Sequence, residues 1–162
     1  DPSLRVGNTL ILLERLAEKF GCQCVVLALD AAHRQVPRNE WKAEWEVVVR
    51  SGKERTGIDA VEWATRATKL GAGEILLTSW DRDGTGAGYD LELLTAVSKA
   101  VHVPVIASGG AANPTHLLEA IKAGADAVLA ASIFHDGVFT VGTVKDALSA
   151  AGVRVRMLED AR

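Results

Sequence analysis

The sequence has few cysteines, no long apolar run and little net charge, and each of these shortages excludes a class of protein. Its 162 residues carry a formal net charge of −3, which gives no sign of a nucleic-acid or anionic-membrane partner. No apolar run approaches the roughly 20 residues that span a bilayer. The opening DPSLRVGN lacks the pattern of a signal peptide. We therefore expect a cytoplasmic protein with a single domain over residues 1–162.

Neither the two cysteines nor the four histidines form a pattern of metal ligands. Side chains at alternate positions of a strand point to opposite faces, so Cys22 and Cys24 are not expected to form a disulfide. We interpret them as small buried hydrophobes. The histidines are scattered at positions 33, 102, 116 and 135, and no spacing fits a metal site. We expect neither a metal nor another cofactor.

Four short apolar runs indicate the strands of a parallel sheet. Each run is almost continuously apolar, which is typical of strands buried on both faces. They are CVVLALD (24–30), EILLTS (74–79), VPVIAS (103–108) and AVLAAS (127–132). Helical patterns separate them, with Asp90 and Asn113 as expected N-caps and Pro114 in a first helical turn. The alternation predicts an α/β fold with right-handed crossovers.

Two segments lie outside this alternation. An amphipathic helix, TLILLERLAEKF, is expected within residues 1–22, ahead of the first strand. Between the first strand and its helix, polar and apolar residues alternate around Trp41, Trp45 and Val47, and a turn follows at SGK. We expect a hairpin or an extended excursion over about residues 36–56.

An internal repeat indicates the scale of the architecture. LGAGEILLTS (70–79) and AGADAVLAAS (123–132) share one pattern and lie two βα units apart. Repetition of this kind builds a fold by stacking equal units. Residues 23–162 would then form four βα units, and a full eight-unit barrel needs roughly 250 residues. We predict a (β/α)4 half-barrel of parallel strands.

Polar residues and glycines follow every predicted strand. Parallel α/β folds bind ligands at the carboxyl ends of their strands, so the functional site is expected at this edge. A carboxylate there can carry protons, as Asp30 could, although it could also cap the turn after its strand. Of Asp81 and Asp83, one is expected to be structural. The strand-end residues are Asp30, Thr78, Ser79, Asp81, Asp83, Ser108, Gly109, Gly110 and Ser132.

Glycines and a serine in two adjacent units favour a phosphate site. Gly109 and Gly110 lie between a strand and a helix start, where backbone N–H groups and the helix dipole attract anions. Ser132 follows the neighbouring strand. On these residues alone, a tight turn with a capping serine is the alternative.

Three stretches together resemble one enzyme family. GAGEILLTSWDRDGTGAGYD, VPVIASGGA and GADAVLAASIFH are similar to the C-terminal half of the cyclase subunits of imidazole glycerol phosphate synthase, which act in histidine biosynthesis. The resemblance covers roughly residues 24–157, and LLTSWDRDGTGAGYD is a specific motif. The related isomerases of the same pathway share the phosphate-binding pattern but not this whole loop.

The resemblance implies a fold, a reaction and roles for individual residues. The fold is a TIM-type (β/α)8 barrel of two similar halves. In the reaction, ammonia from a partner glutaminase closes the imidazole ring of a bisphosphorylated ribonucleotide. Asp30 matches one of two catalytic aspartates, and Glu74 matches an acid on the face that docks the glutaminase. Substrate or phosphate contacts are implied for Thr78, Asp83, Gly84, Ser108, Gly109, Gly110 and Ser132.

The sequence also departs from the family, because it contains no counterpart of the first four βα units or of the other catalytic aspartate. Asn8 and Thr9, in RVGNT, are candidates for a remnant of the second phosphate site. Open strand edges and an apolar inner face favour association. We therefore expect a homodimer or higher even-numbered oligomer that closes the barrel, with weak glutaminase binding. The alternatives are a phosphate-binding module without chemistry and a natural or engineered barrel fragment.

Overall fold

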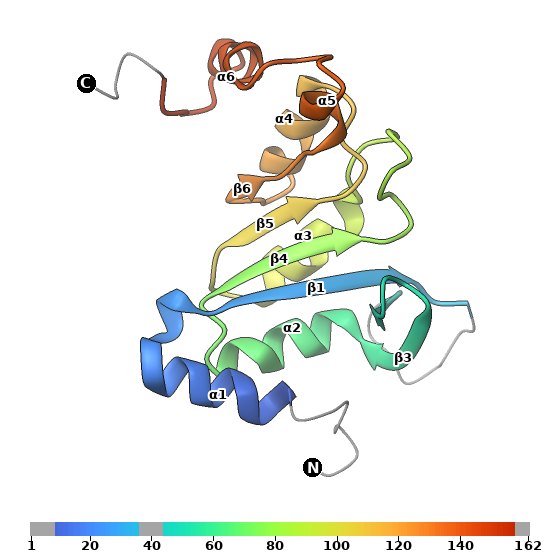
Figure 1. Cartoon of the computed structure of the whole chain (residues 1–162), viewed down its shortest axis with the longest axis vertical. Helices are drawn as coiled ribbons and strands as arrows, with labels where there is room; N and C mark the ends of the chain where they lie inside the picture. Colours follow the sequence, from blue (N-terminus) through green and yellow to red (C-terminus); the bar gives the residue numbers. More distant parts are fainter. Residues whose placement is uncertain (1–8, 36–43, 158–162) are drawn as a thin grey trace.

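Six strands form one sheet, in the order β3-β2-β1-β4-β5-β6. The computed structural model describes residues 9–35 and 44–157. Four strands run parallel and lie side by side in Figure 1. They are β1 (Val26–His33), β4 (Glu74–Ser79), β5 (Val105–Ser108) and β6 (Ala127–Val128). Over the described residues the sheet is not closed, so the fold is α/β with the architecture of a partial TIM barrel.

Helices separate the parallel strands, as the apolar pattern predicts. Asp90 caps α3 by accepting a hydrogen bond from the Leu93 amide, and Asn113 caps α4, whose first residue is Pro114. No helix in the described ranges is long and apolar enough to cross a membrane. The helices are α1 (Thr9–Phe20), α2 (Ala60–Lys69), α3 (Leu91–Ala100), α4 (Pro114–Lys122), α5 (Ser132–His135) and α6 (Val141–Ala150), with a 3-10 turn, η2, at Cys22–Cys24.

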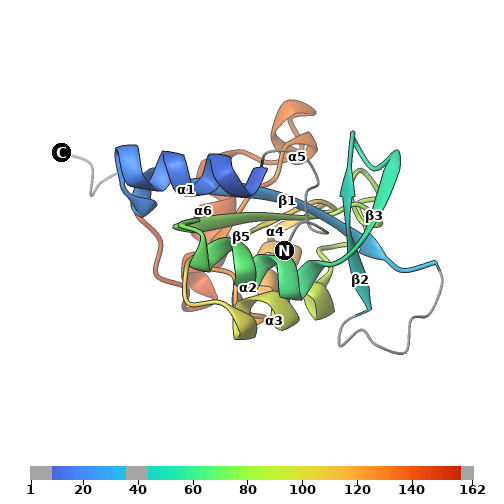
Figure 2. The same cartoon turned by 90° about the horizontal axis from the view of Figure 1, so that it is seen from below.

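The parallel strands bury one face and leave the other partly open. Burial alternates along β4, where Ile75 and Leu77 are buried and Leu76 is half-buried. On β1 the contrast is larger, because Leu27 is buried while Val26 is 50% exposed. Helices α2 and α3 cover the buried face (Figure 2). The expectation of strands buried on both faces is therefore wrong for the described residues, and the open face corresponds to the inside of a barrel.

An antiparallel hairpin extends the sheet beyond β1. It consists of β2 (Trp45–Val49) and β3 (Glu54–Asp59), and lies at the carboxyl end of β1 in Figure 2. The hairpin confirms that interpretation of the excursion, although residues 36–43, with Trp41, lie outside the described residues. β2 pairs with Ala31–His33. Because this pairing prolongs β1 past Asp30, Asp30 lies inside its strand, and the prediction that the strand ends there is wrong.

Three other expectations need correction. Cys22 and Cys24 lie in the turn η2 and are exposed, so they are not buried strand residues. β6 is limited to Ala127–Val128 because it pairs with one described neighbour, β5. Ser132 therefore begins α5 instead of ending a strand. Of the two candidates for a remnant phosphate site, Thr9 begins α1 and Asn8 lies outside the described residues.

Candidate functional site

A row of polar side chains crosses three neighbouring strands near their carboxyl ends. Asp30 on β1 is paired in register with Thr78 on β4, and Thr78 with Ser108 on β5. All three are half-buried and alternate with buried neighbours, so they point to the open face of the sheet. The structure thus brings together three residues that were selected from separate strand ends.

The surroundings of Asp30 favour its protonated form. Burial raises the pKa of the Asp30 carboxyl above its ordinary value of 3.8, a hydrogen bond from the Thr78 side chain opposes the shift, and the negative charge of Asp83 adds to it. In these surroundings the Asp30 carboxyl holds its proton more readily than an exposed aspartate does.

Gly109 and Gly110 are packed against the chain that follows β4. Both are buried, with φ of 91° and 96°. A Cβ on Gly109 would stand 3.0 Å from the Ser79 carbonyl oxygen, and a Cβ on Gly110 would collide with the Gly88 carbonyl oxygen. Close packing of the chain therefore requires glycine at both positions, whether or not an anion binds. At Gly84 there is open space instead, and its φ of 73° is what favours glycine.

The loop between β4 and α3, residues 80–90, is held at both ends and exposed between them. At its start the Trp80 amide donates to the Ala31 carbonyl, at 2.8 Å. Near its end the Gly88 amide donates to Gly110, and the Tyr89 hydroxyl donates to the Leu129 carbonyl, both at 2.8 Å. Burial raises the pKa of Tyr89, so this hydroxyl stays a donor. Residues 81–87, which include Asp83 and Gly84, are exposed.

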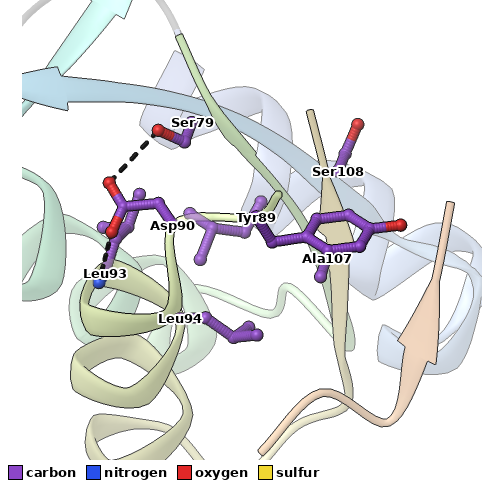
Figure 3. Close-up of a pocket in the computed structure, with 8 residues that line it drawn as sticks. Ser79, Tyr89, Asp90, Leu93, Leu94, Ala107 and Ser108 are labelled. Atoms are coloured by element: carbon purple, nitrogen blue, oxygen red, sulfur yellow. Dashed lines mark hydrogen bonds between the residues drawn. The ribbon is translucent and has the colours of Figure 1, made fainter. Parts of the chain in front are cut away.

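Asp90 is buried where the loop enters α3, and its carboxylate has three hydrogen-bond donors. Figure 3 shows two of them, the Ser79 hydroxyl at 3.2 Å and the Leu93 amide at 3.0 Å. The third is the indole N–H of Trp45, at 3.3 Å. The sequence pattern predicts Asp90 only as an N-cap. No local pattern could predict its link to Trp45, because the two residues are 45 positions apart.

The remaining candidates lie at the margins of this site. Ser132 is exposed at the start of α5, beyond β6. Glu74 begins β4, at the opposite end of the sheet from Asp30. Among residues 9–35 and 44–157, no three His, Cys, Asp or Glu side chains are grouped so that they could hold a metal ion.

The chain matches a known protein family. A family model described as histidine biosynthesis protein matches residues 6–140. The matched range contains all six strands, the row from Asp30 to Ser108 and the whole loop of residues 80–90.

Proposed function

Because the chain belongs to this family of histidine biosynthesis proteins, we propose that it catalyses the ammonia-dependent closure of an imidazole ring. The substrate would be a bisphosphorylated ribonucleotide, as for the cyclase subunits that the sequence resembles. The loop of residues 80–90, whose whole sequence is similar to the cyclases and not to the isomerases, favours this reaction over isomerisation.

Asp30 is the proposed catalytic residue, and its place in one row with Thr78 and Ser108 on the open face of the sheet is the observation that carries the proposal. An acid with an ordinary pKa is almost fully ionised at neutral pH and is a poor proton donor. Burial and the charge of Asp83 raise the pKa of Asp30 against the opposing hydrogen bond from Thr78, and this direction supports a role in proton transfer. Thr78 and Ser108 lie beside it in the same row and would orient the substrate.

One phosphate of the substrate would bind where the strand-end loops converge. Asp83 and Gly84 lie in the exposed part of the loop, and Gly109 and Gly110 lie directly beneath it. Ser132 begins the next element, after β6. Backbone N–H groups at such turns attract anions. Because a Cβ at Gly110 would disturb the loop, Ser132→Ala is the cleaner change for testing phosphate binding.

We further propose that activity requires the open face of the sheet to be covered. Mostly apolar grooves also lie at the two edges of the parallel strands, one of about 260 Å³ between β1, the hairpin and α2, and one of about 430 Å³ between β6, α4 and α6. For the 162-residue chain on its own, a second copy of the chain would cover this open face, with the strand edges of the two copies paired. Light scattering over a dilution series should then detect a dimer or larger even-numbered oligomer. A compact monomer at micromolar concentration would contradict this part of the proposal.

The decisive experiment measures turnover of the ribonucleotide with an ammonium salt. Asp30→Asn should lower kcat about 100-fold or more, while Asp146→Asn, which changes an exposed carboxylate on α6, should leave it unchanged. Turnover that survives in Asp30→Asn would overturn the assignment. Phosphate binding without any turnover would favour a binding module. Because Glu74 lies on the far end of the sheet, Glu74→Gln should affect only glutaminase docking, which we expect to be weak.

A further inference from the structure

The loop of residues 80–90 carries two proposed substrate contacts, and the hydrogen bonds within it are short-range: the Asp83 amide donates to the Ser79 carbonyl at 2.9 Å and the Thr85 amide to the Arg82 carbonyl at 3.1 Å. Residues 81–87 are exposed, and Gly84, Gly86 and Gly88 all have positive φ. Glycines of this kind make a loop conformationally permissive. The short-range hydrogen bonds close the turns of the loop, whereas its position over the sheet depends on contacts with other elements.

The β2–β3 hairpin contacts this loop at three places. The Trp45 indole donates to the Asp90 carboxylate at 3.3 Å. The Trp80 ring lies on the hairpin turn, so that a Cβ on Gly52 would collide with the indole. The third contact runs through His33, at the base of the hairpin, whose amide donates to the Asp81 carboxylate at 2.6 Å.

The two strands of the hairpin are joined by an ion pair between the buried Glu46 and the partly exposed Arg55. Glu46, only 7% exposed, accepts from the Arg55 guanidinium at 2.5 Å and from the Gly57 amide at 3.2 Å. Arg55 also donates to the carbonyl oxygen of His33 at 2.7 Å, while the amide of the same residue binds Asp81. A chain of polar contacts thus runs from the hairpin interior to the loop. Pairing with Arg55, whose side chain is 30% exposed, offsets part of the cost of burying the Glu46 carboxylate.

We propose that the β2–β3 hairpin positions the loop of residues 80–90, and that Trp45, through its hydrogen bond to Asp90, is the main positioning residue. Ser79 and Leu93 donate hydrogen bonds to Asp90 from within the same β4–α3 unit. These two contacts are local and do not link the loop to the hairpin. From another part of the chain, Trp45 donates a hydrogen bond to Asp90 at 3.3 Å, and Nε2 of His33 lies 3.8 Å from the same carboxylate oxygen. That Trp45 thereby aids substrate binding rests on the proposed function, whereas its control of the loop does not.

Hydrogen exchange of two loop amides tests the positioning directly. The Asp83 amide bonds to the Ser79 carbonyl at 2.9 Å, and the Gly88 amide to Gly110 at 2.8 Å. Trp45→Phe removes the indole N–H and keeps an aromatic ring, and it should speed exchange at both amides about tenfold. The Ile75 amide, bonded to Pro104 in the sheet, should be unchanged. Trp63→Phe, a half-buried tryptophan on α2, is the matched control and should change none of them.

Two outcomes would overturn the proposal: loop exchange that stays as in the unchanged chain, or an equal acceleration at Ile75, which would mean general destabilisation. Asp81→Ala provides a second test that does not alter the interior, because Asp81 is exposed. It removes the contact with the His33 amide and should speed loop exchange about threefold.

A kinetic measurement then tests the functional consequence. In the active, assembled enzyme Trp45→Phe should raise KM for the ribonucleotide about tenfold and change kcat less than twofold, because the loop contacts a non-reacting phosphate. A fall in kcat with KM unchanged would contradict a positioning role. If the unchanged chain shows no turnover and binds no inorganic phosphate, the proposed function fails, while the exchange experiment still decides whether Trp45 controls the loop.

Discussion

The two copies of the internal repeat begin alike and end differently. Residues 70–79 lead into β4, and residues 123–132 lead into β6. In the first copy Gly71 has a φ of 103° and its amide donates to Thr68; in the second Gly124 has a φ of 113° and its amide donates to Ile121, both at 3.1 Å. The strands that follow have six and two residues. The local pattern therefore determines how the helix ends, and the neighbours of a strand determine how long it is.

Position in the sheet accounts for this difference. β4 lies between β1 and β5 and pairs with both, whereas β6 pairs with β5 alone among the described residues. The equivalent residues Ile75 and Val128 accordingly differ in burial, since Ile75 is fully buried and Val128 is half-buried. The two copies also differ in what they contribute to the site. Thr78 of β4 hydrogen-bonds the Asp30 side chain, whereas the equivalent residue in the second copy is Ala131, which cannot.

The largest difference between the copies should appear on truncation of their apolar side chains. Ile75→Ala should lower the free energy of unfolding by about 3–4 kcal/mol, because it leaves a cavity in the middle of the sheet. Val128→Ala removes less buried area and should cost about 1 kcal/mol or less. Urea unfolding of both variants measures the two values. Equal losses would mean that β6 is packed as firmly as β4.

The helix-ending glycines should behave more alike. Gly71→Ala and Gly124→Ala both force alanine to a positive φ, which costs about 1 kcal/mol or more. Gly71→Ala should cost roughly 1 kcal/mol more, because its Cβ would collide with that of Ala17, whereas a Cβ at Gly124 would stand 3.0 Å from the Ser98 Cβ. Thermal or urea unfolding of the pair tests the order. A larger loss for Gly124→Ala would contradict it.

The serines that close the two repeats should differ again. Ser79 is 2% exposed and donates to the Asp90 carboxylate, so Ser79→Ala should destabilise the fold by about 1–2 kcal/mol. Ser132 is exposed, and Ser132→Ala should stay within about 0.5 kcal/mol of the unchanged chain. Differential scanning calorimetry would resolve these values. Only Ser132→Ala should weaken binding of inorganic phosphate without a loss of stability.

How much of the fold and the site the sequence predicts depends on how far apart in the sequence the interacting residues lie. Caps such as Asp90 and Asn113 are local, so the pattern predicted them correctly. The end of β1 was misplaced, because His33 is held in the strand by Trp45, twelve residues away, through a hairpin pairing that strand propensity does not reveal. The resemblance selected Asp30, Thr78 and Ser108, but their alignment in one row depends on strand register, which sequence pattern alone does not fix.

The smallest expected effect of these comparisons concerns Asp30. Its carboxyl accepts a hydrogen bond from Thr78 of the first copy, whereas the equivalent Ala131 of the second copy has no hydroxyl group. The folded-state pKa of Asp30 lies above the ordinary 3.8, so the folded chain holds the proton more tightly than the unfolded chain. The stability contributed by this group is therefore present below about pH 3.8 and is lost as the pH rises through the folded-state pKa. Asp30→Asn should be slightly more stable than the unchanged chain at pH 7, by less than about 1 kcal/mol because the group is partly exposed. The difference should vanish near pH 3.

Urea unfolding at the two pH values measures the stability difference. Thr78→Val removes the opposing hydrogen bond, so it should raise the pKa of Asp30 further in an NMR titration. An Asn variant that is less stable at pH 7, or a folded-state pKa at or below 3.8, would show that hydrogen bonding outweighs burial at this strand position.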